Sequence, residues 1–196
     1  MIAAIVLAAG RSARFSQDGR NKLLEDFGGR PLLRRAVDAA LGSRAGETIV
    51  VTGWDHERIA EALAGLPATL VHNPRHAEGM ASSLLAGLAR AGEAEGALIL
   101  LGDMPNVSSV VIDRLIGAFE ETQAAAVIPL RGGRRGNPVL IGRELFPRLS
   151  ELSGDIGARG LLRAARNVVE AEVADDGVLA DVDTPDDLAS LRDSAT

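Results

Sequence analysis

The residues of this chain that could do chemistry are charged side chains placed just after apolar runs. Gly10, Arg11 and Arg14 follow the first run, and Lys22, the single lysine of the chain, comes shortly after them. Glycine lets backbone amides approach an anion closely, and neighbouring cations can share the charge of a polyphosphate. The segment therefore indicates a phosphate-binding loop, with a glycine turn followed by solvated basic residues as the plainer alternative.

Acidic residues follow two further apolar runs. Asp103 comes directly after one of them, and Pro105 prevents a helix from starting at once. A carboxylate at the end of a central strand is a suitable ligand for Mg²⁺, which prefers one or two protein carboxylates plus phosphate oxygens. Asp183 fits either a metal ligand or a residue that flanks a helix start at Thr184. Asp181 is the weaker candidate.

The elements that must position these residues are short apolar runs that alternate with segments of helical spacing. The runs lack a period of two, which is typical of parallel strands covered on both faces. Strands are predicted at Ile2–Ala8, Thr48–Val51, Ala68–Val71, Ala97–Leu101, Ala124–Leu130, Pro138–Ile141, Val168–Val173 and Leu179–Val182. Helices are predicted at 32–41, 55–63, 80–88, 108–119 and from Thr184-Pro185 onward. This alternation predicts an α/β three-layer fold with a mostly parallel sheet, and a ligand site beyond the carboxyl ends of its strands.

Length and composition exclude several classes of protein. The chain of 196 residues fits a single domain, 1–196, and 46% hydrophobic with 24% charged residues excludes disorder. The absence of cysteine excludes disulfides, thiolate zinc sites and thiol nucleophiles, and the net charge of −6 argues against a general nucleic-acid binder. No apolar run is long enough to span a membrane, and the first run lacks the basic start of a signal peptide. We therefore expect a cytoplasmic protein.

The histidines and serines in the middle of the chain are weaker candidates for metal or nucleotide binding. His72 and His76 do not form a helical zinc pair, because Pro74 lies between them. Ser82 and Ser83 lie near the start of a predicted helix, where they are either simple helix surface or hydrogen-bond donors to a nucleotide base.

Two glycine-containing segments of the second half carry arginine. The segment Gly132–Asn137, preceded by Arg131, is expected to be a turn whose arginines either are solvated or reach an anionic substrate. Asp155 is expected near the N-terminus of a helix with Arg159 on its first turn, where a cation opposes the helix dipole. That placement hints at an anion nearby.

A series of short motifs runs through nearly the whole chain in a fixed order. They are Leu7–Phe15 with Lys22–Leu24, Thr52-Gly53, Gly79–Leu84, Gly102–Pro105, Asn137–Val139, Gly154–Arg159 and Asp181–Leu188. Together they resemble the MobA/MocA-like nucleotidyltransferases, and in particular the molybdenum cofactor cytidylyltransferases. The first motif with Gly-Asp-Met-Pro is specific for the superfamily, and the last two narrow the resemblance toward the cytidylyl branch.

The resemblance implies a single Rossmann-like α/β domain that transfers a nucleotidyl group from a nucleoside triphosphate to a phosphate-bearing acceptor and releases pyrophosphate. It implies Mg²⁺ bound by Asp103 and Asp183, and catalysis by Arg14, Lys22 and Asp103. The implied nucleotide-binding residues are Leu7, Ala8, Ala9, Gly10, Arg11, Ser12, Thr52, Gly53, Gly79, Ser82 and Ser83. The implied acceptor-binding residues are Asn137, Asp155 and Arg159.

The same resemblance bears on the partners. Ala9 favours CTP, because Leu-Ala-Ala-Gly tends to accompany cytidine in this family and Leu-Ala-Gly-Gly guanosine. The implied acceptor is molybdopterin or the molybdenum cofactor, with a molybdoenzyme as recipient and neither nucleic acid nor membrane as partner. Asn137 departs from the histidine of many cytidylyl members, which leaves the acceptor less certain than the reaction. Alternatives are GTP or another acceptor phosphate, a non-catalytic nucleotide- or cofactor-delivery protein, and, least favoured, a nicotinamide dehydrogenase, whose glycine fingerprint is missing.

Overall fold

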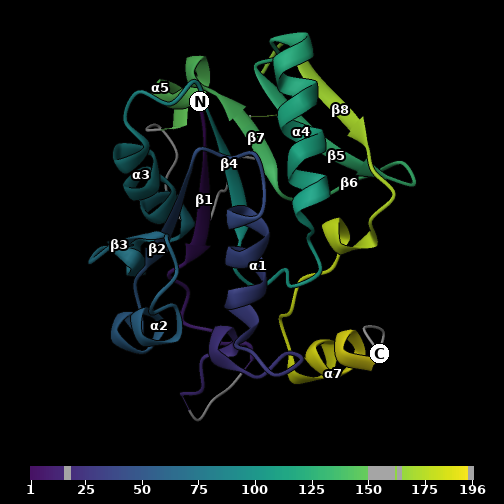
Figure 1. Ribbon diagram of the computed structural model, residues 1–196. Helices are drawn as coiled ribbons and strands as arrows, with labels where there is room; N and C mark the ends of the chain where they lie inside the picture. Colours follow the sequence, from purple (N-terminus) through teal and green to yellow (C-terminus); the bar gives the residue numbers. More distant parts are fainter. Residues whose placement is uncertain (16–18, 150–161, 163–164, 194–196) are drawn as a thin grey trace.

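The central element of the computed structural model is an eight-stranded sheet with helices on both faces (Figure 1). The structure describes residues 1–15, 19–149, 162 and 165–193. The strands are β1 Ile2–Ala8, β2 Glu47–Thr52, β3 Thr69–His72, β4 Gly96–Leu101, β5 Ala126–Arg131, β6 Arg134–Arg135, β7 Val139–Gly142 and β8 Val168–Glu172. The helices are α1 Leu32–Leu41, α2 His56–Ala62, α3 Met80–Ala91, α4 Ser109–Thr122, α5 Phe146–Leu149 and α7 Pro185–Asp193, with 3₁₀ turns η1 Lys22–Leu24, η2 His76–Glu78, η3 Arg143–Leu145 and η4 Asp176–Leu179.

The sheet is parallel in one half and mixed in the other. Its order is β3-β2-β1-β4-β7-β5-β6, with β8 beside β5. The four strands from β3 to β4 are parallel, whereas β7 runs antiparallel to both β4 and β5. The predicted α/β fold with a mostly parallel sheet is confirmed, and β1, β2 and β4 all end at the lower edge in Figure 1.

Two hydrophobic clusters cover the two faces of the sheet and explain why the strands lack a period of two. On β1, Ala4 and Val6 pack in the cluster that contains α1 and α4, while Ala3 and Ile5 pack in the cluster that contains α3. All four side chains are fully buried. Because both faces of β1 are covered, every position of the strand must be apolar.

The predicted strand Leu179–Val182 is wrong. The 3₁₀ turn η4 ends at Leu179, and the following residues continue past the end of β4 without joining the sheet. Its backbone groups find other partners: the Val178 carbonyl accepts from the Asn137 N–H, and the Val182 N–H donates to the Asp103 carbonyl. The predicted turn 132–137 differs too, because it contains the short strand β6.

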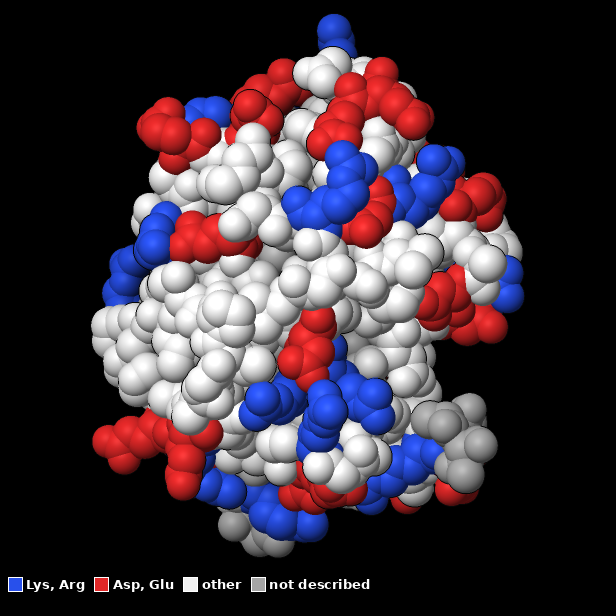
Figure 2. Space-filling view, viewed as in Figure 1, with Lys and Arg blue, Asp and Glu red and all other residues white. Residues whose placement is uncertain are grey.

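Acidic and basic side chains are interspersed over the face shown in Figure 2. One group of basic side chains lies below the middle of this view, between the positions of α1 and α7 in Figure 1. It lies toward the edge at which the parallel strands end. Among the described residues, none of the helices combines the length and the apolar character needed to cross a membrane.

Candidate active site

A cavity of about 810 Å³ lies at the carboxyl ends of β1 and β4. Its walls come from the described residues of the segment 9–22 after β1 (the first loop), from the start of α3, from the end of β4 and from the segment before α7. The lining residues are Leu7, Ala9, Gly10, Arg11, Ser12, Ala13, Arg14, Phe15, Lys22, Leu23, His76, Ala77, Gly79, Met80, Ser83, Ile99, Leu101, Asp103, Asn137, Val139, Leu162, Asp181 and Asp183. The cavity is therefore at the position expected for a ligand in an α/β fold.

Three carboxylates converge on this cavity. One oxygen each of Asp103, Asp181 and Asp183 lies within 4.8 Å of the others. Asp103 follows β4, and the other two flank Val182, whose buried side chain and whose N–H bond to the Asp103 carbonyl anchor the segment against the end of β4. From the sequence, Asp181 is a weaker candidate than Asp183, yet the structure brings both carboxylates to the same place.

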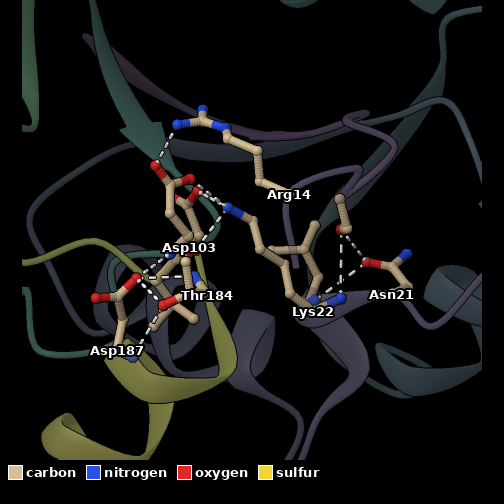
Figure 3. Close-up of polar contacts among 10 residues, drawn as sticks. Arg14, Asn21, Lys22, Asp103, Thr184 and Asp187 are labelled. Carbon is tan, nitrogen blue, oxygen red and sulfur yellow. Dashed lines mark hydrogen bonds and ion pairs between the residues drawn. The ribbon is translucent and has the colours of Figure 1, made fainter. Parts of the chain in front are cut away.

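The ammonium group of Lys22 lies among these carboxylates (Figure 3). Its Nζ is 2.7 Å from Asp103 Oδ2 and 3.3 Å from Asp183 Oδ1, and it also donates to the carbonyl of Val182. The side chain of Lys22 is only 13% exposed, so solvent weakens these ion pairs little. The one lysine of the chain thus joins the first loop to both acidic segments.

Arg14 joins the same network from the open side. Its guanidinium donates to Asp183 Oδ2 over 2.7 Å, and its side chain is 80% exposed (Figure 3). An exposed ion pair of this kind contributes little to stability, because water competes for both partners. Arg14 is therefore able to exchange Asp183 for an anionic ligand.

Asn21 positions the first loop, a role that sequence analysis missed. It is buried, and its Oδ1 accepts from the Leu23 N–H and lies 3.3 Å from the Ser12 hydroxyl, which accepts in turn from the Lys22 N–H. Its Nδ2 donates to Asp55, far along the chain. An asparagine just before a short helical turn is a signal that could have identified this cap.

Hydrogen bonds at the start of α7 hold residues 181–183, which carry two of the carboxylates, in place. The Asp187 carboxylate accepts from the N–H groups of Asp183 and Thr184 and from the Thr184 hydroxyl, and Thr184 accepts from the Asp187 N–H. This reciprocal pair is a helix cap of the capping-box type. The hydrogen bonds from Thr184 hold the pKa of Asp187 below its usual value, so it remains a charged cap.

The carboxylates fit a divalent cation. Removal from water raises the pKa of Asp181, and the like charges of Asp103 and Asp183 raise it further. Asp103 Oδ1 is buried and has no hydrogen-bond partner in the described part of the chain. An unsatisfied carboxylate oxygen beside two further carboxylates is a donor set of hard oxygens, which suits Mg²⁺ or Mn²⁺.

Not every residue that the sequence analysis assigned to the nucleotide lines the cavity. Leu7, Ala9, Gly10, Arg11, Ser12, Gly79 and Ser83 line it, whereas Ala8, Thr52, Gly53 and Ser82 do not. Ala8 packs in the core, and the Thr52 hydroxyl contacts His56 and the Val71 carbonyl. Gly53 lies so close to His76 that a Cβ would come within 2.4 Å of it. These positions support the walls of the cavity from behind.

Ser82 forms part of a buried hydrogen-bond network at the start of α3. Its hydroxyl donates to the carbonyls of Arg75 and Gly79 and accepts from Asn73 Nδ2, which also donates to Ser83. The proposed contact of Ser82 with a base would require these bonds to break. Ser83, which lines the cavity, is the better placed of the two serines.

We expect Ser82→Ala to destabilise the protein by about 1–2 kcal/mol, because it leaves Asn73 and two carbonyls without this partner. The KM for the nucleotide should change less than about twofold, since the hydroxyl is already bonded within the protein. Thermal unfolding and initial rates measure the two effects. A large increase in KM with an unchanged melting temperature would instead support a direct contact with the base.

Of the three predicted acceptor-binding residues, the structure describes only Asn137. Asn137 lines the cavity, between β6 and β7. Asp155 and Arg159 lie outside the described residues. His56, at the start of α2, is half-buried and stacks on His72, with ring centroids 4.5 Å apart.

Comparison with known proteins gives consistent relatives. Residues 4–171 match the family described as MobA-like NTP transferase domain. The chain is 30% identical to nicotine blue oxidoreductase of Paenarthrobacter nicotinovorans, over 97% of this chain and 96% of that protein. It is 28% identical to molybdenum cofactor cytidylyltransferase of Escherichia coli strain K12, over 98% of this chain and 96% of that protein.

Solved structures share the whole architecture. A nucleotidyl transferase from Methanothermobacter thermautotroptrophicus, Mth528, superimposes with a TM-score of 0.87 at 28% identity, covering 99% of this chain and 97% of that one. Rv0371C from Mycobacterium tuberculosis H37Rv, solved as a complex with manganese, superimposes with a TM-score of 0.81 at 27% identity and 98% coverage of both chains.

Proposed function

The chain belongs to the MobA-like NTP transferase domain family, and from this premise we propose that it transfers the cytidylyl group of CTP to the phosphate of molybdopterin. The reaction would release pyrophosphate and depend on Mg²⁺. The observation that carries the proposal is the position of Lys22 between Asp103 and Asp183, next to the first loop and inside the cavity.

The chemistry of this transfer suits such a site. One phosphate must approach the α-phosphate of another, so the site has to supply positive charge and alignment. The attacking phosphate monoester is already ionised near neutral pH, so it needs no general base. The cavity accordingly contains charged residues, and the histidine in its described lining, His76, belongs to η2 and packs beside Gly53.

The residues of the first loop would bind the triphosphate. Gly10 presents backbone without a side chain, and a Cβ there would meet no atom within 4 Å, so the loop is open to a ligand. Arg14 and Lys22 would stabilise the charge that develops on the leaving pyrophosphate. Asp103 and Asp183, with Asp181 beside them, would hold Mg²⁺, which neutralises phosphate charge when it is bound.

Two features support CTP and molybdopterin in particular. Ala9 lines the cavity in the motif that accompanies cytidine in this family, and the relative from Escherichia coli is named molybdenum cofactor cytidylyltransferase. The proposal includes the cytoplasm as the place of reaction and a molybdoenzyme as recipient. A relative named as an oxidoreductase does not change it, because no Gly-x-Gly-x-x-Gly follows β1 in this sequence.

A pyrophosphate-release assay with purified molybdopterin and each of four nucleoside triphosphates tests the proposal. We expect kcat/KM for CTP to exceed that for GTP by at least about tenfold, because one or two lost base contacts cost about 1.4 kcal/mol or more. Omission of Mg²⁺ should abolish the reaction. Oxidation of NADH with no pyrophosphate from any nucleotide would contradict it, and a preference for GTP would change the base but leave the reaction class.

A further inference from the structure

A second cavity of about 240 Å³ adjoins the first. Leu101, Asn137 and Asp181 line both cavities, so the two share a wall at the end of β4. The second cavity is lined in addition by Arg134 and Arg135 of β6 and by η4. The second cavity thus has two arginines on the side of β6. It has one acidic residue, Asp181, on the side where Asp103, Asp181 and Asp183 converge.

The arginines of this cavity differ in their partners. Arg135 Nε bonds to Glu170 over 2.6 Å, and the neighbouring Arg131 bonds to Asp176 over 2.6 Å. Arg134 has no ion pair or side-chain hydrogen bond to any residue in the described ranges and is exposed. Its guanidinium is therefore available to a ligand, and no acidic residue of the described chain competes for it.

Close backbone packing fixes the strand that carries these arginines. A Cβ on Gly136 would lie 2.3 Å from the Val178 carbonyl oxygen, so only glycine allows β6 and η4 to approach this closely. The Asn137 N–H donates to the same carbonyl, and the Gly136 N–H donates to the Pro129 carbonyl. Backbone hydrogen bonds and close packing thus fix the chain next to Arg134 and Arg135. A backbone that is already ordered loses less conformational entropy when the two side chains bind a ligand.

We propose that the second cavity is the acceptor subsite, in which Arg134, with Arg135 beside it, binds the phosphate of the acceptor. This inference rests on the proposed function and adds to it the cavity and the side chains that would hold the phosphate of the acceptor. A guanidinium presents paired N–H donors that match two oxygens of a phosphate. At about 240 Å³ the cavity is smaller than the 300–1,000 Å³ typical of sites for whole drug-sized ligands, and it suits the phosphate-bearing end of a larger molecule.

The position of the subsite fits the chemistry. An oxygen of the acceptor phosphate forms a bond to the α-phosphorus of CTP, and the bond from that phosphorus to the oxygen bridging to the β-phosphate breaks. The electron pair leaves on pyrophosphate, on the side of Arg14 and Lys22. An acceptor bound at Arg134 would approach from Asn137 and β6. Its phosphate would then meet the α-phosphate of CTP where the two cavities adjoin. The two arginines would offset the repulsion between them.

Calorimetric titration with phenyl phosphate tests the subsite directly. The protein is first saturated with Mg²⁺ and α,β-methylene-CTP, which fills the nucleotide site and cannot release pyrophosphate. We expect Arg134→Ala to weaken the binding of phenyl phosphate at least about tenfold, because it removes a charge-assisted hydrogen bond. Arg134→Lys, which keeps the charge but not the paired donors, should fall between. Benzoate should bind much more weakly than phenyl phosphate.

Arg114→Ala is the matched control, because Arg114 is an exposed arginine of α4 outside both cavities. It should bind phenyl phosphate as the wild type does. Equal affinities of the Arg134→Ala variant and the wild type, equal losses in Arg134→Ala and Arg114→Ala, or benzoate binding as tight as that of phenyl phosphate would overturn the proposal.

The subsite and the proposed function fail in different ways. If pyrophosphate is released from CTP and molybdopterin but Arg134→Ala leaves the KM for molybdopterin unchanged, the subsite is wrong and the function stands. If no nucleotide gives pyrophosphate while binding of phenyl phosphate still depends on Arg134, the protein has a phosphate-binding site at Arg134, but the proposed function and the role of that site as an acceptor subsite are wrong.

Discussion

Asp103→Asn should lower the rate of pyrophosphate release by at least about a hundredfold, which corresponds to about 2.7 kcal/mol of transition-state stabilisation. Asparagine keeps the volume of the side chain but removes its charge. In the wild type, Asp103 Oδ2 is 2.7 Å from Lys22 Nζ, and the buried Oδ1 has no partner among the described residues. The variant therefore loses a partner of Lys22 and a ligand for the divalent ion at once.

The control for this variant is Asp186→Asn on the first turn of α7. Asp186 is exposed, lies close in sequence to the acidic segment and is outside the cavity lining, so its rate should stay within about twofold of the wild type. Manganese binding followed by electron paramagnetic resonance gives a second readout, and Asp103→Asn should weaken it. A folded Asp103→Asn variant with wild-type rate and manganese affinity would remove the basis of the proposed function.

The convergence of the site could be predicted because of how parallel strands are arranged. Lys22 and Asp103 are far apart in sequence, but each follows a strand that ends at the same edge of the sheet. Since ligands bind at that edge in α/β folds, polar residues after buried strands are candidates from sequence alone. The structure places Lys22 Nζ next to Asp103 Oδ2 at this edge.

The direction in which a polar residue points could not be predicted in the same way. Thr52 and Ser82 also lie at or near this edge, yet their hydroxyl groups bond within the protein and face away from the cavity. Asn21 escaped notice because its role depends on contacts with Ser12 and Asp55 that only the folded chain brings together. Hydrogen-bond satisfaction of buried groups decides these cases, and it depends on tertiary neighbours.

The segment before α7 illustrates the same limit. The apolar pattern at 179–182 favours a strand, but Val182 instead bonds to the end of β4 and leaves the residues on either side free to face the cavity. Asp181 was therefore undervalued, since its role follows from a backbone contact between distant segments. The same contact brings three carboxylates together, and Lys22 offsets part of their mutual repulsion.

Lys22→Met should change catalysis and cation binding in opposite directions. Methionine keeps an unbranched apolar stem of similar length and removes the ammonium group that lies among Asp103, Asp183 and the Val182 carbonyl. Pyrophosphate release should fall at least about a hundredfold, because the leaving group loses one of the cations proposed to stabilise its charge. Manganese should bind about tenfold more tightly, because three carboxylates then repel one another without the competing positive charge of Lys22.

The variant Lys22→Arg tests whether the positive charge at residue 22 is enough, or whether the compact ammonium group is also needed. It keeps the positive charge, so the manganese affinity should stay within about threefold of the wild type, while the larger planar group should still reduce the rate. A Lys22→Met variant that releases pyrophosphate at the wild-type rate would show that Lys22 has no role at the leaving group. Weaker manganese binding in that variant would show instead that the ammonium group holds the carboxylates in position for the ion, since loss of a competitor alone can only tighten binding.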